Sequence, residues 1–240
     1  MKVIITENYQ EMSEKASKIL IDIVKNNPNA ILGLATGSSP IGTYQNMIKD
    51  HQENGTSYKN VRTVNLDEYV GLTANHDQSY AYFMRTNLFD SIDIDLKNTN
   101  LPCGSASDLQ KECDRYNALL ENMQQDVQVL GLGSNGHIGF NEPGTPLSSV
   151  THLVDLTENT IKDNSRLFSS IDEVPKQALS MGIKNIMQAK SIVMVVSGKN
   201  KAQAVKGMVQ GEITTDLPAS VLQLHPNVTV ICDKEAASLL

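Results

Sequence analysis

Residues 131–144 read Gly131-Leu-Gly-Ser-Asn-Gly-His-Ile-Gly-Phe-Asn-Glu-Pro-Gly144, directly after the apolar run Val127 to Leu130. The apolar run is typical of a buried strand. The five glycines that follow allow the backbone to approach a ligand closely. A histidine and a glutamate in such a loop can act together, because Glu142 can orient or tune the imidazole of His137. The segment therefore predicts a strand that ends in an active-site loop.

The same loop also matches the pattern of a dinucleotide-binding turn. Gly131, Gly133 and Gly136 fit G-x-G-x-x-G, and Asp155 lies about where a ribose-binding acid is expected. That motif requires a helix to begin at its glycines, so that the helix N-terminus holds the pyrophosphate. A further glycine and Pro143 stand where the first helical turns would be. We therefore expect a loop here and no dinucleotide cofactor.

The composition limits the class of protein. The chain has 240 residues, 40% of them hydrophobic, and a formal net charge of −7, which argues against nucleic acid as the main partner. It has no apolar run long enough to span a membrane, and its first residues do not form a signal peptide. The three cysteines, Cys103, Cys113 and Cys232, show no C-x-x-C pairing and no zinc spacing. We expect reduced thiols, a cytoplasmic location and no metal.

Short β-branched runs alternate with helical patterns along the whole chain. The expected strands are Val3–Thr6, Ala30–Ala35, Val61–Leu66, Val127–Gly131, His152–Leu156, Ser191–Ser197 and Val228–Cys232. The expected helices include Glu11–Lys25, Ile41–Glu53, Gln78–Phe89, Asp108–Gln124 and Lys199–Gln210. This alternation predicts an α/β fold with a single doubly wound, mostly parallel sheet and helices on both faces (Rossmann-like). No repeat or linker interrupts the pattern, so residues 1–240 are expected to form one domain.

In such a sheet, ligands bind beyond the carboxyl ends of the strands. Polar residues follow the second expected strand as Thr36, Gly37, Ser38 and Ser39, ahead of a helix. This turn suits a phosphate, because free N–H groups and the helix dipole attract anions. A simple turn capped by a serine fits the sequence equally well.

Three further clusters also follow expected strands. Asp67 and Glu68 follow the third, and because neighbouring strand residues point to opposite sides, only one of them is expected to face a ligand. The loop of Asn135, His137 and Glu142 follows the fourth. Lys201 lies at the start of an expected helix, where the helix dipole disfavours a positive charge. A bound anion would offset this unfavourable interaction. Arg166 is another candidate cation, which the sequence alone does not place.

Together these segments resemble the glucosamine-6-phosphate deaminase family, which also includes 6-phosphogluconolactonase-like proteins. The resemblance covers nearly the whole chain in order, and the matching segments are Gly33–Pro40, Asn65–Leu72, Gly131–Pro143, Asn164–Arg166, Ser197–Lys201 and Leu222–Pro226. It implies conversion of D-glucosamine 6-phosphate and water to D-fructose 6-phosphate and ammonia, without a cofactor. The implied partner is therefore a small phosphosugar.

The resemblance also implies a role for each candidate residue. His137 would open the sugar ring, Glu142 would hold His137 in the useful tautomer, and Asp67 would move a proton between C2 and C1. Asn135 stands beside them in the catalytic loop. The phosphate would be bound by Thr36, Gly37, Ser38, Ser39, Arg166 and Lys201.

Asn135 departs from the family pattern, in which many members have Asp at this position. Asn can form hydrogen bonds but carries no charge, so we expect Glu142 alone to supply the negative charge near His137. The substitution Asn135→Asp adds a carboxylate that favours the protonated imidazole. It should therefore move the acidic limb of the pH–rate profile to higher pH, and an unshifted limb would contradict this expectation.

A second departure concerns regulation. Allosteric hexameric members carry two basic residues in the strand after the Asn-Glu-Pro loop and a longer C-terminal tail, whereas this chain has His152 and Val154 there and stops at Leu240. We therefore expect no activation by N-acetylglucosamine 6-phosphate and a monomer or small homo-oligomer. The resemblance also implies that residues 157–174 correspond to the family's mobile lid.

Two other functions remain as alternatives. One is a lactonase or isomerase that acts on another phosphosugar, although ring opening followed by enolisation suits the Asp67, His137 and Glu142 set better than water activation at an ester. The other is a non-catalytic phosphosugar sensor, which would have no need for these proton-transfer residues. The sequence favours the deaminase over both.

Overall fold

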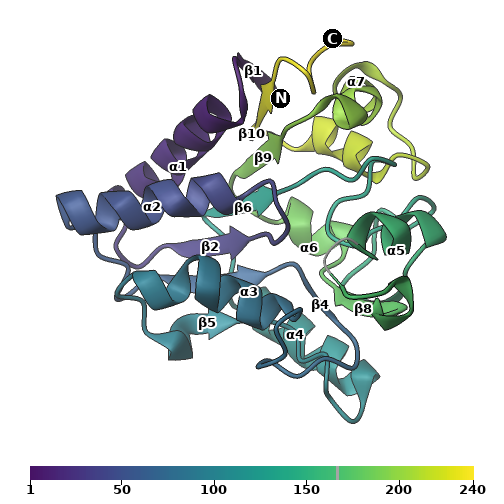
Figure 1. The fold of residues 1–240 in the computed structure, drawn as a ribbon, viewed down its shortest axis with the longest axis horizontal. Coiled ribbons are helices and arrows are strands. Elements are labelled where there is room, and N and C mark those ends of the chain that lie inside the picture. Colours follow the sequence, from purple (N-terminus) through teal and green to yellow (C-terminus); the bar gives the residue numbers. More distant parts are fainter. Residues whose placement is uncertain (166–167) are drawn as a thin grey trace.

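A central seven-stranded parallel sheet organises the protein (Figure 1). The structure is a computed structural model that describes residues 1–165 and 168–240. The strand order is β1-β10-β9-β6-β2-β3-β5, and all neighbouring strands are parallel. The strands are β1 (Lys2–Thr6), β2 (Ile31–Leu34), β3 (Arg62–Asn65), β5 (Thr99–Asn100), β6 (Val127–Leu130), β9 (Ile192–Val196) and β10 (Val228–Asp233). The predicted α/β class with a mostly parallel sheet is confirmed.

A second, smaller sheet corrects the prediction of a single sheet. Its antiparallel strands are β4 (Asp67–Tyr69), β8 (Gln177–Ser180) and β7 (His152–Asp155), in the order β4-β8-β7. The expected strand His152–Leu156 therefore does not belong to the parallel sheet. In β7, Val154 is buried while Leu153 and Asp155 are exposed, the one-sided burial that an antiparallel sheet permits.

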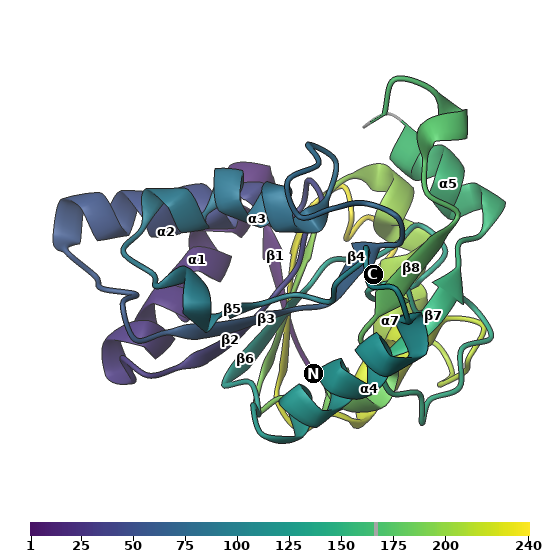
Figure 2. The same ribbon diagram turned by 90° about the horizontal axis from the view of Figure 1, so that it is seen from below.

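Helices cover both faces of the parallel sheet. Figure 2 shows α1 (Tyr9–Asn26), α2 (Ile41–Asn54) and α3 (Tyr80–Asn87) on one side and α4 (Leu109–Glu121) on the other. The remaining helices are α5 (Glu158–Asn164), α6 (Ile183–Met187) and α7 (Ala202–Gln210), and short 3-10 turns occupy Phe89–Ser91, Leu96–Asn98, Ile171–Glu173, Lys199–Lys201 and Pro218–Leu224. The side chains of Asn8, Ser79 and Asp108 accept backbone N–H bonds and so cap α1, α3 and α4. Among the described residues, no helix is both long enough and apolar enough to cross a membrane.

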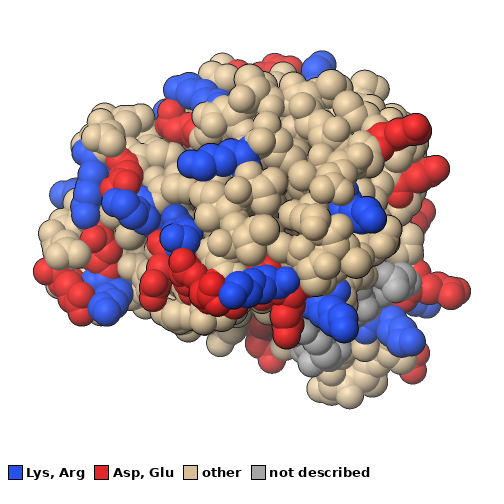
Figure 3. All heavy atoms as spheres, turned by 90° about the horizontal axis from the view of Figure 1, so that it is seen from above, with Lys and Arg blue, Asp and Glu red and all other residues tan. Residues whose placement is uncertain are grey.

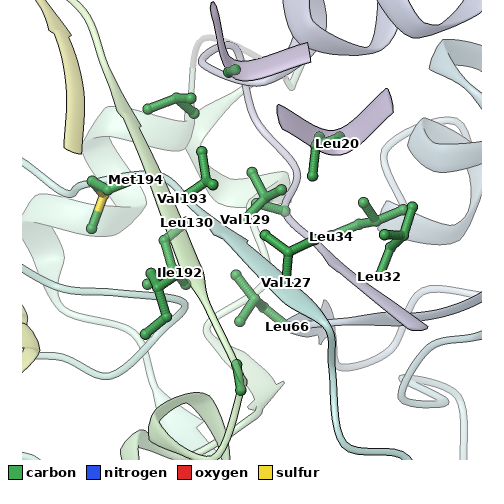
Figure 4. Packing of buried hydrophobic residues seen from close by; sticks show 14 of the residues in the cluster. Leu20, Leu32, Leu34, Leu66, Val127, Val129, Leu130, Ile192, Val193 and Met194 are labelled. Atoms are coloured by element: carbon green, nitrogen blue, oxygen red, sulfur yellow. The ribbon is translucent and has the colours of Figure 1, made fainter. Parts of the chain in front are cut away.

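The core lies between the sheet and these helices. Every residue of β2, β6 and β9 is buried, as expected for strands covered on both faces. Figure 4 shows leucine, valine and isoleucine side chains of these strands packed together, with Leu20 of α1 nearby. Met12, Ala16, Leu20 and Val24 repeat at four-residue spacing on the buried face of α1. Burial of this continuous apolar layer stabilises the sheet that carries the loops described below.

The strand order reverses at the centre of the parallel sheet. The chain runs outward from β2 through β3 to β5, and then returns to the other side of β2 with β6 before it continues to β9 and β10. The loops after β2 and β6 therefore separate from each other and leave a crevice between them. The candidate site is therefore expected at this reversal of the strand order.

Charged side chains are interspersed on the surface. On the face drawn in Figure 3, lysines and arginines lie among aspartates and glutamates. That face therefore presents no continuous basic stripe of the kind that binds nucleic acid.

Candidate active site

A cavity of about 530 Å³ lies at the carboxyl ends of the parallel strands. The loops after β2, β3, β6 and β9 all line it, which brings the four clusters that the sequence placed after strands together at one site. Its lining includes Thr36, Gly37, Ser38, Ser39, Asp67, His137 and Lys201. The helix α5 adds Thr160, Lys162 and Asn164. The resemblance assigns residues 157–174 to a lid and includes Asn164 in a matching segment, but it gives no role to Thr160 or Lys162.

Asp67 presents a buried carboxylate to the cavity. It is the first residue of β4, and only 6% of its surface is exposed. Burial raises its pKa to about 8, and the negative charge of Glu68 adds to the effect. A carboxylate with such a pKa is a stronger base than an exposed one and titrates near neutral pH.

Glu68 points away from the cavity, as the alternation along a strand predicts. Its carboxylate accepts hydrogen bonds at 2.9 Å from the backbone N–H groups of Tyr69, Tyr80 and Ala81. Two of these donors belong to the first turn of α3, where an acid is favoured by the helix dipole. Glu68 therefore fixes α3 against β4.

His137 lies in a loop and not in a helix, and every residue of this loop is described. Between β6 and β7 the chain forms only turns and a short bridge between Ile138 and Asn141, so the predicted loop is confirmed. The imidazole packs against the backbone of Gly133, where an added Cβ would lie 2.4 Å from the ring atoms Nδ1 and Cε1. Gly133 therefore provides the space in which the ring sits.

Glu142 faces His137 from the same loop. Its Oε2 lies 3.6 Å from Nδ1 of His137 and accepts a hydrogen bond of 2.8 Å from Nδ2 of Asn135. Its Oε1 accepts hydrogen bonds from the hydroxyl groups of Thr160 and, at 3.3 Å, Thr157. Burial by itself would raise the pKa of Glu142, but the nearby imidazole of His137 and hydrogen bonds from Thr160 and Asn135 outweigh it and lower the pKa to about 2. Glu142 is therefore ionised throughout the physiological range.

Asn135 contacts the carboxylate of Glu142 rather than the imidazole ring. Besides its bond to Glu142, its Oδ1 accepts the backbone N–H of His137 at 3.2 Å. The substitution Asn135→Asp would therefore also remove a donor to Glu142 and place a second negative charge beside it. Both changes favour a protonated His137, the direction expected from the sequence.

The turn Thr36–Ser39 links β2 to α2. Gly37 has a φ of 87°, a left-handed conformation that favours glycine. The helix begins after Pro40, which makes no side-chain capping bond, so the N-cap position of α2 is a proline and not a serine. Thr36, Ser38 and Ser39 instead line the cavity beside the start of a helix, the usual surroundings of a bound phosphate.

Lys201 lies in the loop after β9 and lines the same cavity as this turn. It is half-buried and lines the cavity together with Ser197 and Asn200, whereas Lys199 is exposed and is not part of the lining. The carboxylate of Asp233 holds the start of this loop, since it accepts the Ser197 hydroxyl at 2.5 Å and the backbone N–H of Gly198. Arg166, the other candidate cation, lies outside the described residues.

Aromatic side chains form one wall of the site, which the sequence analysis did not anticipate. Tyr80 and Phe140 line the cavity and stack with ring centroids 6.1 Å apart. Tyr69 packs behind them, 4.8 Å from Tyr80 and 5.6 Å from Phe140. The residues come from three separate segments, so no local pattern could have revealed the wall.

The sequence matches a known family over most of its length. The family described as glucosamine-6-phosphate isomerases/6-phosphogluconolactonase matches residues 6–231. Glucosamine-6-phosphate deaminases from Geobacillus sp. (strain WCH70) and Clostridium perfringens (strain ATCC 13124) are 52% and 51% identical over 241 aligned residues. The alignments cover 100% of this chain and 96% and 100% of those proteins.

Solved structures show the same fold. A monomeric glucosamine-6-phosphate deaminase superimposes with a TM-score of 0.99 at 48% identity, with 100% of both chains covered. The 6-phosphogluconolactonase from Trypanosoma brucei has a TM-score of 0.82 at 20% identity and covers 100% of this chain and 98% of its own. The second similarity concerns the fold alone.

Proposed function

The chain belongs to the family of glucosamine-6-phosphate isomerases and 6-phosphogluconolactonases, and from that premise we propose that it is a glucosamine-6-phosphate deaminase of amino-sugar catabolism. The observation that carries the proposal is the pairing, at one cavity, of the buried base Asp67 with His137 and its partner Glu142. Relatives that are 51–52% identical over the whole chain are glucosamine-6-phosphate deaminases. The reaction converts D-glucosamine 6-phosphate and water to D-fructose 6-phosphate and ammonia.

The reaction begins with ring opening at His137. The imidazole moves a proton from the anomeric hydroxyl to the ring oxygen, and the ionised Glu142 stabilises the positive charge that His137 gains. Asp67 then removes the C2 proton and returns it to C1, so that an imine forms at C2. Water adds to the imine and ammonia leaves. No step needs an electron acceptor, which agrees with the expectation of no cofactor.

The phosphate is held away from the reacting carbons. Thr36, Gly37, Ser38 and Ser39 offer backbone N–H groups and hydroxyls at the start of α2, and Lys201 offers a positive charge from the loop after β9. Arg166 remains a proposed third ligand. Binding of the remote phosphate orients C1 and C2 against Asp67.

The pKa of Asp67 sets a testable pH dependence. The base must be ionised, and burial raises its pKa to about 8, so kcat/KM should fall as the pH drops below that value, by about tenfold for each pH unit. Initial rates between pH 6 and 9 check this. Because the substrate also titrates, the pH dependence of the melting temperature of the free protein reads the same group without substrate. A flat profile in both measurements would contradict the assignment.

Lys201→Met tests the phosphate site. The variant keeps an unbranched side chain of similar length but removes its charge, so KM for glucosamine 6-phosphate should rise by about 10- to 100-fold, the size of a lost charge-assisted bond. The change in kcat should be smaller. Lys199→Met is the matched control, because Lys199 is exposed two residues earlier and does not line the cavity. Equal KM values for the two variants would remove Lys201 from the site.

The product assay decides between the proposed reaction and its alternatives. Ammonia and fructose 6-phosphate should form in equal amounts from glucosamine 6-phosphate. Hydrolysis of 6-phosphogluconolactone without ammonia release would support the lactonase instead. Saturable phosphosugar binding without any product would support a sensor.

Regulation and assembly also remain proposals. The similar deaminase of known structure is monomeric, and we propose a monomer or small homo-oligomer for this chain, without activation by N-acetylglucosamine 6-phosphate. His152, at one of the two positions that are basic in allosteric members, bonds through Nδ1 to the backbone carbonyl of Val150 at 2.7 Å. A cytoplasmic location stays a prediction.

A further inference from the structure

The carboxylate of Glu142 divides its two oxygens between two parts of the protein. Oε2 serves the catalytic loop, since it accepts a bond from Asn135 and faces Nδ1 of His137. Oε1 turns away from His137 and accepts the hydroxyl of Thr160, which belongs to α5. Each oxygen is therefore held by a different segment, Oε2 by Asn135 of the catalytic loop and Oε1 by Thr160 of α5.

The hydroxyl of Thr160 is well prepared to donate. Thr160 is 2% exposed, and its Oγ1 has the hydroxyl of Thr157 as a neighbour at 3.1 Å. Thr157, the cap of α5, also accepts the backbone N–H of Thr160. The single proton of Thr157 can go either to Oγ1 of Thr160 or, at 3.3 Å, directly to Oε1 of Glu142. In both arrangements the proton of Thr160 is left for Oε1, so both hydroxyls support the same carboxylate oxygen.

Anchoring matters because a glutamate does not fix its own carboxylate. Rotation about the last bond of the side chain is broad and weakly hindered. At 3.6 Å, Oε2 is just beyond normal hydrogen-bond distance from Nδ1 of His137. A small rotation of the carboxylate therefore decides whether the bond to His137 closes or opens, and a donor on Oε1 limits that rotation.

We propose that Thr160 is a positioning residue for ring opening: its hydroxyl holds Oε1 of Glu142 so that Oε2 stays directed at His137. The inference rests on the proposed function, since the role of His137 in ring opening belongs to that proposal. Thr160 acts through Glu142 and not on the reacting atoms. Burial alone would raise the pKa of Glu142, and after His137 the Thr160 bond is the next cause that lowers it, which agrees with a carboxylate that this bond stabilises.

Two variants of Thr160 test the role. Thr160→Val keeps the shape and removes the hydroxyl, and should lower kcat for glucosamine 6-phosphate by about 10-fold, the effect of one lost bond to a charged group, with KM nearly unchanged. Thr160→Ser keeps the hydroxyl and should restore most of kcat. Thr151→Val is the matched control, because Thr151 is also buried, is not in the cavity lining, and its hydroxyl has no hydrogen-bond partner among the described residues. Its kcat should equal that of the wild type.

The affected step can be separated from the later chemistry. Ring opening is measured as exchange between the α and β anomers of glucosamine 6-phosphate by NMR saturation transfer, above the rate in buffer. Proton abstraction is measured as deuterium uptake at C2. Thr160→Val should slow anomer exchange, whereas Asp67→Asn should keep anomer exchange and lose deuterium uptake.

The outcomes distinguish the inference from the function on which it rests. A higher KM with unchanged kcat in Thr160→Val, or equal losses in Thr160→Val and Thr160→Ser, would overturn the positioning role. If the wild type does not turn over glucosamine 6-phosphate, the proposed function fails. The positioning claim is then still read from the ¹⁵N resonances of the His137 imidazole, which should change in Thr160→Val and stay the same in Thr151→Val. Unchanged His137 resonances in both variants would overturn it.

Discussion

Asp67→Asn should lower kcat for glucosamine 6-phosphate by at least about 100-fold, as expected for a lost general base. The asparagine side chain has the same shape as aspartate but cannot take a proton from C2. Asp67 is buried at the first position of β4 and is paired there with Ser180 of β8, so the exchange should leave the cavity intact. KM should change much less than kcat, because the phosphate is bound by other loops. Steady-state ammonia release measures both constants.

The same substitution should stabilise the protein at high pH. The pKa of Asp67 is raised from its ordinary value of 3.8 to about 8 in the folded state, so the folded protein binds more protons than the unfolded one between these values. The contribution of Asp67 to stability is therefore fully present below pH 3.8 and is lost as the pH rises through about 8. The neutral side chain in Asp67→Asn does not ionise, so the variant avoids this loss. The melting temperature of the variant should exceed that of the wild type by at least about 2 °C at pH 9.

The control for this experiment is Asp77→Asn, a surface position with a side chain that is 74% exposed. It should alter neither kcat nor the pH dependence of the melting temperature. Two results would contradict the role of Asp67: an Asp67→Asn variant with near-normal kcat, or a melting-temperature difference that does not grow between pH 5 and pH 9. A loss of activity with a lower melting temperature at every pH would indicate structural damage instead.

Gly133→Ala should lower kcat by about 100-fold, because a displacement of a catalytic group by about 1 Å can cost that much. The added methyl group would lie 2.4 Å from Nδ1 and Cε1 of His137, too close for any real contact. Gly133 does not have a positive φ, so its backbone accepts alanine and the strain falls on the imidazole. The ring must shift away, and its distance from Glu142 changes. The measurement is kcat with KM, together with the rate of anomer exchange.

Gly131→Ala is the matched comparison in the same loop. Apart from its two chain neighbours, a Cβ at Gly131 would have no heavy atom of the described residues within 4 Å, and the φ of Gly131 is not positive. It should therefore leave the His137 ring in place and reduce kcat less than Gly133→Ala. If the two variants lose kcat equally, the effect comes from the loop as a whole and not from the space that Gly133 leaves for His137.

The parallel sheet and the position of the site could be predicted from local sequence. Continuous apolar runs such as Ile192–Val196 indicate buried strands, and the helical pattern of Glu11–Lys25 corresponds to α1 (Tyr9–Asn26). Because ligands bind beyond the carboxyl ends of parallel strands, the polar residues after each strand could be expected at one edge. The cavity lies there.

The small antiparallel sheet could not be predicted as such. Its strand β4 is only Asp67–Tyr69, and the polar residues of that strand resemble a turn. Its partner β8 pairs with it across more than 100 residues of chain, Asp67 opposite Ser180. Such pairing depends on long-range packing, which periodicity does not record.

The sequence by itself determined the buried strands of the parallel sheet, the long helices and the residue types that can move protons, because these depend on local side-chain chemistry and on periodicity along the backbone. Only the tertiary structure decided that α5 brings Thr160 to Glu142, that Tyr80 and Phe140 form a wall, and that Asp67 is buried enough for its pKa to rise. Each of these properties arises from contacts between segments distant in the chain. The electrostatic environment of a carboxylate depends on what surrounds it in space, and the fold supplies those surroundings.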